Sequence, residues 1–218
     1  MIREIELCHK GFKMKNFCVY LSKNGLFRFR TNFLFSALLR VPEEEINCLE
    51  KLEEKIELHL PMKIPYGDVK RIEKFLKKIA EIYGTEGLII PQFHPEKQIY
   101  KFFVPHQTAG PGFVTSEEPI IERDGFFPIG TIHSHAFCSA FHSPGDIQDE
   151  AQNFSGIHMT AGRLDLENPE WVATLVVNGR RIKLNPADVL ELEADSPPEW
   201  FQKICLDVHA ERVCGLRK

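Results

Sequence analysis

The sequence predicts a mixed α/β fold, in which a mixed β-sheet is flanked by helices and a small α+β region precedes it. First, apolar strand-like runs alternate with amphipathic helical segments along the 218-residue chain, as in layered α/β proteins. Second, turns that contain glycine or proline separate these segments at short intervals. Third, 43% of the residues are hydrophobic and 27% are charged, a composition typical of globular proteins that bury a core.

The N-terminal region predicts a hairpin followed by a helix. Residues 17–30 carry two apolar runs around Asn24-Gly25, a pair typical of tight β-turns. Residues 33–41 are apolar and fit either a strand or a helix. Residues 42–60 are charged, and their apolar positions follow a helical spacing at Ile46, Leu49, Leu52 and Ile56.

The chain is expected to divide into three parts. Residues 61–67 contain two prolines and a glycine, which predict a boundary near residue 63. Residues 1–62 then form an accessory region, residues 63–187 the main α/β core, and residues 188–218 a helical extension.

The central region predicts one long helix and a series of strands. Residues 68–83 carry an apolar stripe at helical spacing, with Asp68 as a capping residue and Gly84 at the end. Further strands are expected at residues 85–90, 98–105, 126–135, 156–164 and 171–185, the last as a hairpin around Asn178-Gly179. A loop is expected at residues 106–119, and helices at 143–154 and 197–215.

Charge and cysteine usage exclude several function classes. The net charge of −4 gives no general footprint for nucleic acid. Neither a signal peptide nor an apolar run of about 18 residues is recognisable, so no membrane association is expected. The cysteines form no CxxC pair, which predicts free thiols and a cytoplasmic protein; they are at positions 8, 18, 48, 138, 205 and 214.

Three residues in the stretch GTIHSHAFCSAFHSPGD, residues 130–146, predict a metal site. His133 and His135 are two apart on a predicted strand, so both imidazoles point to the same face. Asp146 falls in the first turn of the next predicted helix, where its carboxylate can complete a set of three ligands. Two histidines, one aspartate and an open position are typical of a catalytic zinc site.

Each part of this pattern also has a structural explanation. A single histidine in a strand is more often a satisfied polar group than a ligand. Ser143 and Asp146 with Pro144 between them form a variant of the capping box that starts helices. The joint occurrence of all parts in one short stretch favours the metal site.

The stretch resembles the JAMM motif of the JAB/MPN metalloproteases. That motif is His-Ser/Thr-His, seven residues, Ser, two residues and Asp, and it is matched by His133, Ser134, His135, Ser143 and Asp146. The resemblance covers about residues 65–187 and implies the MPN/JAMM core, which is cytidine-deaminase-like, with one zinc ion per chain. HSHAFCSAFHSPGDIQDE also looks like the JAB proteins of bacterial mobile and PRTRC-type gene clusters, as do YLSKNGLF, LPMKIPYG and VPHQT. Many family members have proline after the second histidine, where this chain has Ala136.

The resemblance also implies roles for further residues. The family places a glutamate upstream as general base, and Glu86, 47 residues before His133, fits best, with Glu117, Glu118 and Glu122 as alternatives. Ser143 would donate a hydrogen bond to the oxyanion of the tetrahedral intermediate. Cys138 and His142 lie between the motif positions and leave open a thiol nucleophile or a fourth ligand.

The leading hypothesis from the resemblance is a zinc-dependent isopeptidase or peptidase that acts at the C-terminus of a ubiquitin-like modifier. Its expected partners are that modifier or its conjugates, together with activating-enzyme-like and conjugating-enzyme-like proteins. Alternatives are a zinc amidase acting on a sulfur-carrier-protein adduct or a small amide, a non-haem iron oxygenase, and a non-catalytic MPN-type scaffold.

Overall fold

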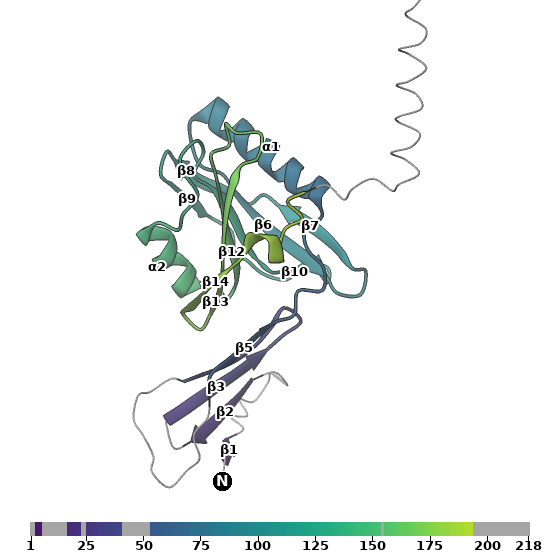
Figure 1. Cartoon of the computed structure of the whole chain (residues 1–218), viewed down its shortest axis with the longest axis vertical. Coiled ribbons are helices and arrows are strands. Elements are labelled where there is room, and N and C mark those ends of the chain that lie inside the picture. Colours follow the sequence, from purple (N-terminus) through teal and green to yellow (C-terminus); the bar gives the residue numbers. More distant parts are fainter. Residues whose placement is uncertain (1–2, 6–16, 23–24, 41–52, 154, 194–218) are drawn as a thin grey trace, which may run out of the picture.

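The computed structural model describes residues 3–5, 17–22, 25–40, 53–153 and 155–193 of the chain (Figure 1). Within these residues the protein is mixed α/β, as predicted, with three β-sheets and two α-helices. The predicted C-terminal helix at 197–215 lies outside the described residues.

The N-terminal region forms an antiparallel sheet of five strands. In order across the sheet they are β1 (Arg3–Ile5), β2 (Phe17–Ser22), β3 (Gly25–Thr31), β4 (Phe35–Arg40) and β5 (Lys55–Leu58). The predicted hairpin is present as β2 and β3, and the ambiguous run is strand β4. The helix predicted at residues 42–60 was wrong where the structure describes it, because Lys55–Leu58 pair with β4. Residues 41–52 lie outside the described residues.

The main sheet carries the central region. Its order is β10 (Phe127–Pro128), β6 (Leu88–His94), β11 (Gly130–Ser134), β12 (Gly156–Gly162), β13 (Glu170–Val177) and β14 (Arg180–Leu184), and β7 (Ile99–Phe103) also pairs with β6. All described pairs in this sheet are antiparallel except β11 with β12, which are parallel.

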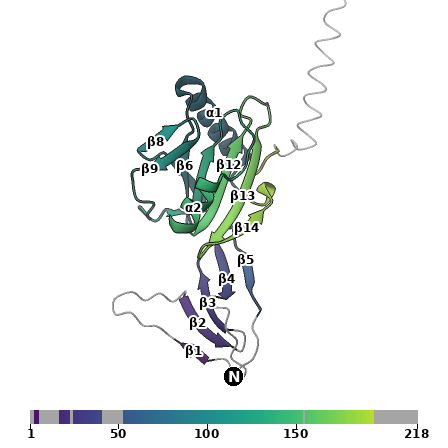
Figure 2. The same cartoon turned by 90° about the vertical axis from the view of Figure 1, so that its left-hand side faces the viewer.

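The two helices lie on opposite faces of the main sheet (Figure 2). Trp171 of β13 donates a hydrogen bond to Glu73 of α1 (Tyr66–Tyr83) at 3.0 Å. Thr174, three residues further along β13, contacts His142, which lies just before α2 (Pro144–Asn153), at 3.0 Å. Because side chains alternate between the faces of a strand, these two contacts belong to opposite faces. Neither described helix is long and apolar enough to cross a membrane.

The two faces of the main sheet differ in polarity. Strand register places apolar side chains on the face toward α1: Ile132, Ile157, Met159, Ala161, Ala173 and Leu175. The same register places polar side chains on the face toward α2: Thr131, His133, His158, Thr160 and Thr174. The face under α1 is therefore the apolar core, and the face under α2 is available for chemistry.

The segment predicted as a loop at 106–119 contains a small hairpin instead. Its strands are β8 (Gln107–Gly110) and β9 (Phe113–Ser116), which pair with each other across the turn Pro111-Gly112. The Gln107 side-chain amide accepts a hydrogen bond from the Leu88 backbone N–H at 2.8 Å and so ties the hairpin to β6. The strands are short and mostly polar, so their pattern resembled that of a loop.

The predicted accessory region shares apolar core with the rest of the chain. Leu34, Phe35, Ala37 and Leu39 belong to the same buried cluster as residues of α1 and the main sheet. The Phe33 ring lies 6.0 Å from that of Phe93 and 5.6 Å from that of Phe127, measured between centroids. Val189 and Leu190, from the predicted C-terminal extension, are also buried in this cluster.

Substitution of Phe35 tests this shared core. Phe35 is fully buried, and Phe35→Ala is expected to lower the free energy of unfolding by about 3–5 kcal/mol because it leaves a cavity. Chemical denaturation should show one transition that shifts as a whole. The control Phe113→Ala removes a half-exposed ring and should change stability by about 0.5 kcal/mol or less. Two separate transitions, only one of which shifts, would show that the N-terminal sheet unfolds independently.

Candidate metal centre

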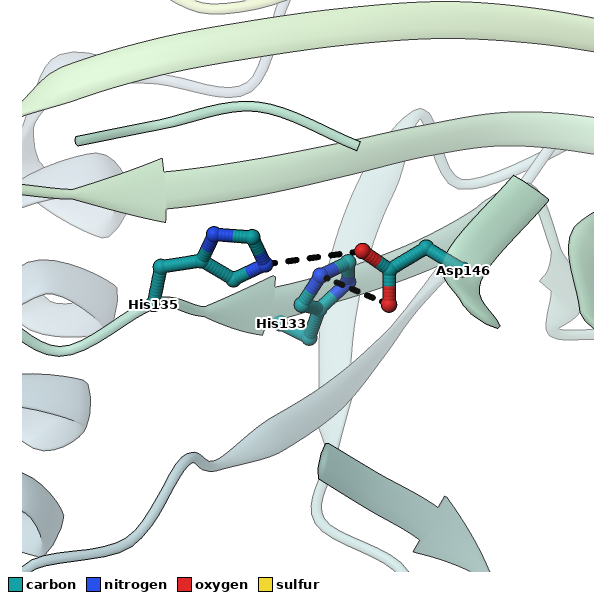
Figure 3. A group of neighbouring side chains, drawn as sticks. All are labelled: His133, His135 and Asp146. Carbon is teal, nitrogen blue, oxygen red and sulfur yellow. Dashed lines mark ion pairs between the residues drawn. The ribbon is translucent and has the colours of Figure 1, made fainter. Parts of the chain in front are cut away.

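The end of β11 and the first turn of α2 bring three side chains together (Figure 3). Nε2 of His133 lies 3.5 Å from Oδ1 of Asp146, and Nε2 of His135 lies 3.4 Å from Oδ2. Both histidines are buried, and Asp146 is about one-fifth exposed. The carboxylate therefore lies between the two imidazoles, at the mouth of a largely buried site.

The separation of these atoms fits a metal ion. One ligand atom from each of the three residues can be chosen so that all lie within 4.8 Å of one another. Two ligands of a tetrahedral zinc ion, each about 2.0–2.1 Å from it, are about 3.3 Å apart, close to the two distances between histidine nitrogen and aspartate oxygen. The group formed by His133, His135 and Asp146 can therefore hold a metal ion.

His135 is positioned by a turn that follows β11. Its backbone N–H donates to the Ala161 carbonyl at 2.8 Å, and its own carbonyl accepts from the Cys138 N–H at 2.9 Å. Ala136 between them has φ of 49°, in the left-handed region. Proline cannot adopt this angle because its ring holds φ near −65°. Ala136 therefore occupies a turn that proline would not permit.

Asp146 is positioned by the start of α2. The Ser143 N–H donates to Asp146 Oδ2 at 2.6 Å, and the Asp146 N–H donates to Ser143 Oγ at 3.2 Å. This reciprocal pair is the predicted capping box, and the helix begins at Pro144 as expected. Burial alone would raise the pKa of Asp146, but hydrogen bonds with His133 and His135 hold it well below its usual range. Asp146 is thus ionised, as a ligand must be.

Glu86 lies beside this group, two residues before β6. Ser134 N donates to the Gly87 carbonyl at 3.1 Å, and Gly87 N donates to the Ser134 hydroxyl at 3.1 Å, so β11 holds the backbone next to Glu86. Burial raises the pKa of Glu86 to about 7; the charge of Asp146 adds to this effect and that of His135 opposes it. A carboxyl with this pKa can accept and return a proton near neutral pH.

The alternative glutamates have other surroundings. Glu117 is exposed and accepts a hydrogen bond from Thr108 at 2.6 Å. Glu118 contacts Arg123 at 3.4 Å, and Glu122 is exposed. Of the four candidates, Glu86 is the buried one, and its charge is coupled to those of His135 and Asp146.

Neither the alternative nucleophile nor the alternative ligand belongs to the group whose ligand atoms lie within 4.8 Å of one another. Cys138 is an exposed free thiol. The Nδ1 atom of His142 lies 3.0 Å from Glu150, and its Nε2 atom lies 3.0 Å from Thr174. Both ring nitrogens of His142 are engaged, which argues against its role as a fourth ligand.

The hydroxyl of Ser143 can serve both roles that the sequence suggested. Its oxygen accepts the capping hydrogen bond from Asp146 N. A hydroxyl that accepts a hydrogen bond still carries a proton to donate. The capping role therefore leaves Ser143 able to stabilise a developing negative charge.

Sequence reasoning missed four polar residues around the site. Thr160 contacts Nε2 of His133 at 3.2 Å, and Thr131 contacts Nδ1 of His158 at 2.8 Å. Glu150 is buried in α2. A signal was present in GIHMTAG of β12, where His158 and Thr160 alternate with apolar residues and so share one face.

A cavity of about 510 Å³ opens beside the metal group, and His133 and Asp146 form part of its lining. β9 and the segment after it contribute Val114, Thr115, Ser116, Glu118, Pro119 and Ile120. α2 contributes Asp149 and Glu150 on the other side, and Leu88, Thr131 and His158 complete the lining. Its volume falls within the range of about 300–1,000 Å³ typical of ligand pockets.

Comparison with known proteins adds no identification. No family model matches the chain, and no curated protein matches it significantly.

Gly162 is predicted to control the loop that follows His135. A Cβ atom there would lie 2.3 Å from Ala140 N and 2.6 Å from the Cys138 carbonyl oxygen. Gly162→Ala should displace this loop and weaken metal binding by at least about tenfold, as substitutions that misplace ligands do. The control Gly67→Ala in α1 adds a Cβ that meets nothing within 4 Å, so zinc affinity should be unchanged. Equal affinities in competition with a chelator would contradict the prediction.

Metal binding is predicted to weaken as the pH falls. Burial alone would lower the pKa of His135, but the hydrogen bond to Asp146 and the charge of Glu86 outweigh it and raise the pKa. Because the imidazole must lose its proton to bind a metal, affinity should fall by up to about tenfold per pH unit below this raised pKa. Zinc competition between pH 8 and pH 5.5, corrected for the chelator, measures this slope. An unchanged affinity over this range would show that no histidine proton is displaced; His106→Gln, at an exposed position, should keep the wild-type slope.

Proposed function

We propose that the protein is a zinc-dependent hydrolase of amide bonds, a JAMM-type peptidase or isopeptidase that acts at the C-terminus of a ubiquitin-like modifier. The observation that carries the proposal is the convergence of His133, His135 and Asp146 next to a buried carboxyl, Glu86, whose pKa is about 7. Two imidazoles and one carboxylate with an open position suit catalytic zinc.

The residues have distinct roles in this reaction. Zinc held by the three ligands would act as a Lewis acid and lower the pKa of a water molecule to about 7. Glu86 accepts a proton from the attacking water and delivers it to the leaving nitrogen. The Ser143 hydroxyl donates a hydrogen bond to the oxyanion of the tetrahedral intermediate. Ser134, through its two bonds to Gly87, keeps the backbone beside Glu86 in place.

The substrate class rests on the resemblance to the JAMM motif. His133, Ser134, His135, Ser143 and Asp146 match its fixed positions, and the order of helix, glutamate, histidine strand, aspartate helix and two further strands fits the MPN/JAMM core. The cavity between β9 and α2 offers space for substrate next to the metal group. A cytoplasmic location and partners from a ubiquitin-like conjugation system belong to the same proposal.

Glu86→Gln is the decisive variant. The amide keeps the size and shape of the side chain but cannot accept and return a proton. Zinc content and melting temperature should stay near those of the wild type, whereas turnover should fall by about two to four orders of magnitude. Turnover is measured as release of a fluorogenic amine from the C-terminal glycine of a ubiquitin-like protein, and zinc by elemental analysis.

Matched controls separate the possible outcomes. Glu117→Gln, Glu118→Gln and Glu122→Gln should leave turnover within a few-fold of the wild type. His135→Ala should remove both zinc and turnover. Full activity of Glu86→Gln would move the base elsewhere. A wild-type protein that binds zinc but cleaves no amide probe would favour the scaffold alternative, and one that binds iron would favour the oxygenase.

A further inference from the structure

In the stretch of helix α2 whose burial is described, the side chains that contact the sheet and its neighbouring segments are charged. Burial is described for its residues 144–150, and among these Glu150 is the buried one. Ile147, an apolar residue of the same stretch, is 42% exposed. In this stretch, therefore, apolar packing does not fix the helix that supplies Asp146.

The carboxylate of Glu150 has two direct partners from other segments. Its Oε1 lies 3.0 Å from Nδ1 of His142, and its Oε2 accepts from Nη1 of Arg181 on β14. Burial alone would raise the pKa of Glu150, but the His142 hydrogen bond, the charge of His158 and the Arg181 hydrogen bond outweigh it and lower the pKa. The side chain is thus an ionised group held in a fixed place beneath the helix.

The partners of Glu150 are themselves fixed to the sheet. Nε2 of His142 lies 3.0 Å from the Thr174 hydroxyl on β13. Arg181 lies opposite Val176 in the β13–β14 pairing, on the same face as Thr174. Because His142 directly precedes Ser143, the same contacts also fix the point where α2 begins. The start of the helix and its second turn are thereby both tied to the face that carries His133.

Glu150 and Asp146 are four residues apart on α2. Residues with this spacing lie one above the other on the same side of a helix. A rotation or shift of α2 that moved Glu150 away from Arg181 would therefore also move Asp146 away from His133 and His135. Their present separations of 3.5 and 3.4 Å leave little room for such movement if one ion is to contact all three residues.

We propose that Glu150 is a positioning residue for the metal centre, which, through His142 and Arg181, holds α2 where Asp146 can act as a ligand. The inference rests on the metal site of the proposed function but not on its substrate or reaction. In this proposal, a buried ion-pair network outside the set of ligands influences the metal affinity.

Glu150→Gln in the full chain tests the proposal. Loss of the charge weakens the contacts to His142 and Arg181, so zinc should bind about 10–100-fold more weakly in competition with a chromophoric chelator. The visible absorption of bound Co²⁺, which depends on coordination geometry, should also change. Arg181→Gln removes the other partner from a partly exposed position and should weaken zinc binding in the same direction, which keeps the test valid if Glu150→Gln does not fold.

Glu73→Gln is the matched control for a merely structural role. Glu73 is also a buried glutamate with two partners, Lys70 at 2.9 Å and Trp171 at 3.0 Å, but it lies on α1 across the sheet. Its loss can lower stability, but zinc affinity and the Co²⁺ spectrum should not change.

Three results would overturn the inference. Zinc affinity of Glu150→Gln and Arg181→Gln within twofold of the wild type, with an unchanged Co²⁺ spectrum, removes the positioning role and leaves the proposed function standing. An equal loss of affinity in Glu73→Gln reduces the effect to general stability. A wild-type protein without zinc affinity would overturn the metal centre itself, and the inference with it. Wild-type zinc binding without amide hydrolysis, combined with weaker binding in the two variants, supports the inference independently of the reaction.

Discussion

The parallel pairing of β11 with β12 is the constraint on which the site depends. Parallel neighbours cannot be joined by a tight turn, so the chain between them must cross one face of the sheet. Here that connection contains α2. The helix therefore starts near the end of the strand that carries the two histidines, and Asp146 in its first turn comes to lie opposite them. The residues between His135 and Asp146 thus provide the length of chain that is needed to leave the strand, turn and begin the helix.

The two faces of the main sheet hold their helices by different interactions. Toward α1, the apolar side chains of β11, β12 and β13 form the core, and the hydrophobic effect holds the helix. Toward α2, the row of histidines and threonines gives little apolar area to bury. On this face, hydrogen bonds and ion pairs hold α2 instead of apolar contacts. Because these interactions are directional, they restrict the position of the helix more than apolar contacts do. In a helix that carries a metal ligand, this restriction keeps the ligand atom close to the other ligands.

Local patterns were sufficient to predict the parts of the fold that depend on neighbours in sequence. The apolar stripe of α1, the capping of α2 at Ser143 and the spacing of His133 and His135 are local, and the structure contains each of them. The prediction at 42–60 failed in its described part, and so did that at 106–119, because strands β5, β8 and β9 are short and their pairing with other segments outweighs their own pattern. The contact between Glu150 and Arg181 spans 31 positions, and no local spacing indicates it. The prolines and glycine that predicted a boundary near residue 63 are local signals, and they do not indicate that Phe33 packs on Phe93.

The turn at Ala136 has a consequence for sequence variation among proteins with this site. With φ of 49°, the position accepts glycine, asparagine or aspartate readily, disfavours β-branched residues and excludes proline. A chain that carries proline after its second histidine must therefore leave the strand along a different path. A single substitution at this position cannot convert one loop path into the other unless the backbone after the histidine also changes its conformation. Proline at this one position therefore indicates a loop geometry that differs from the one seen here.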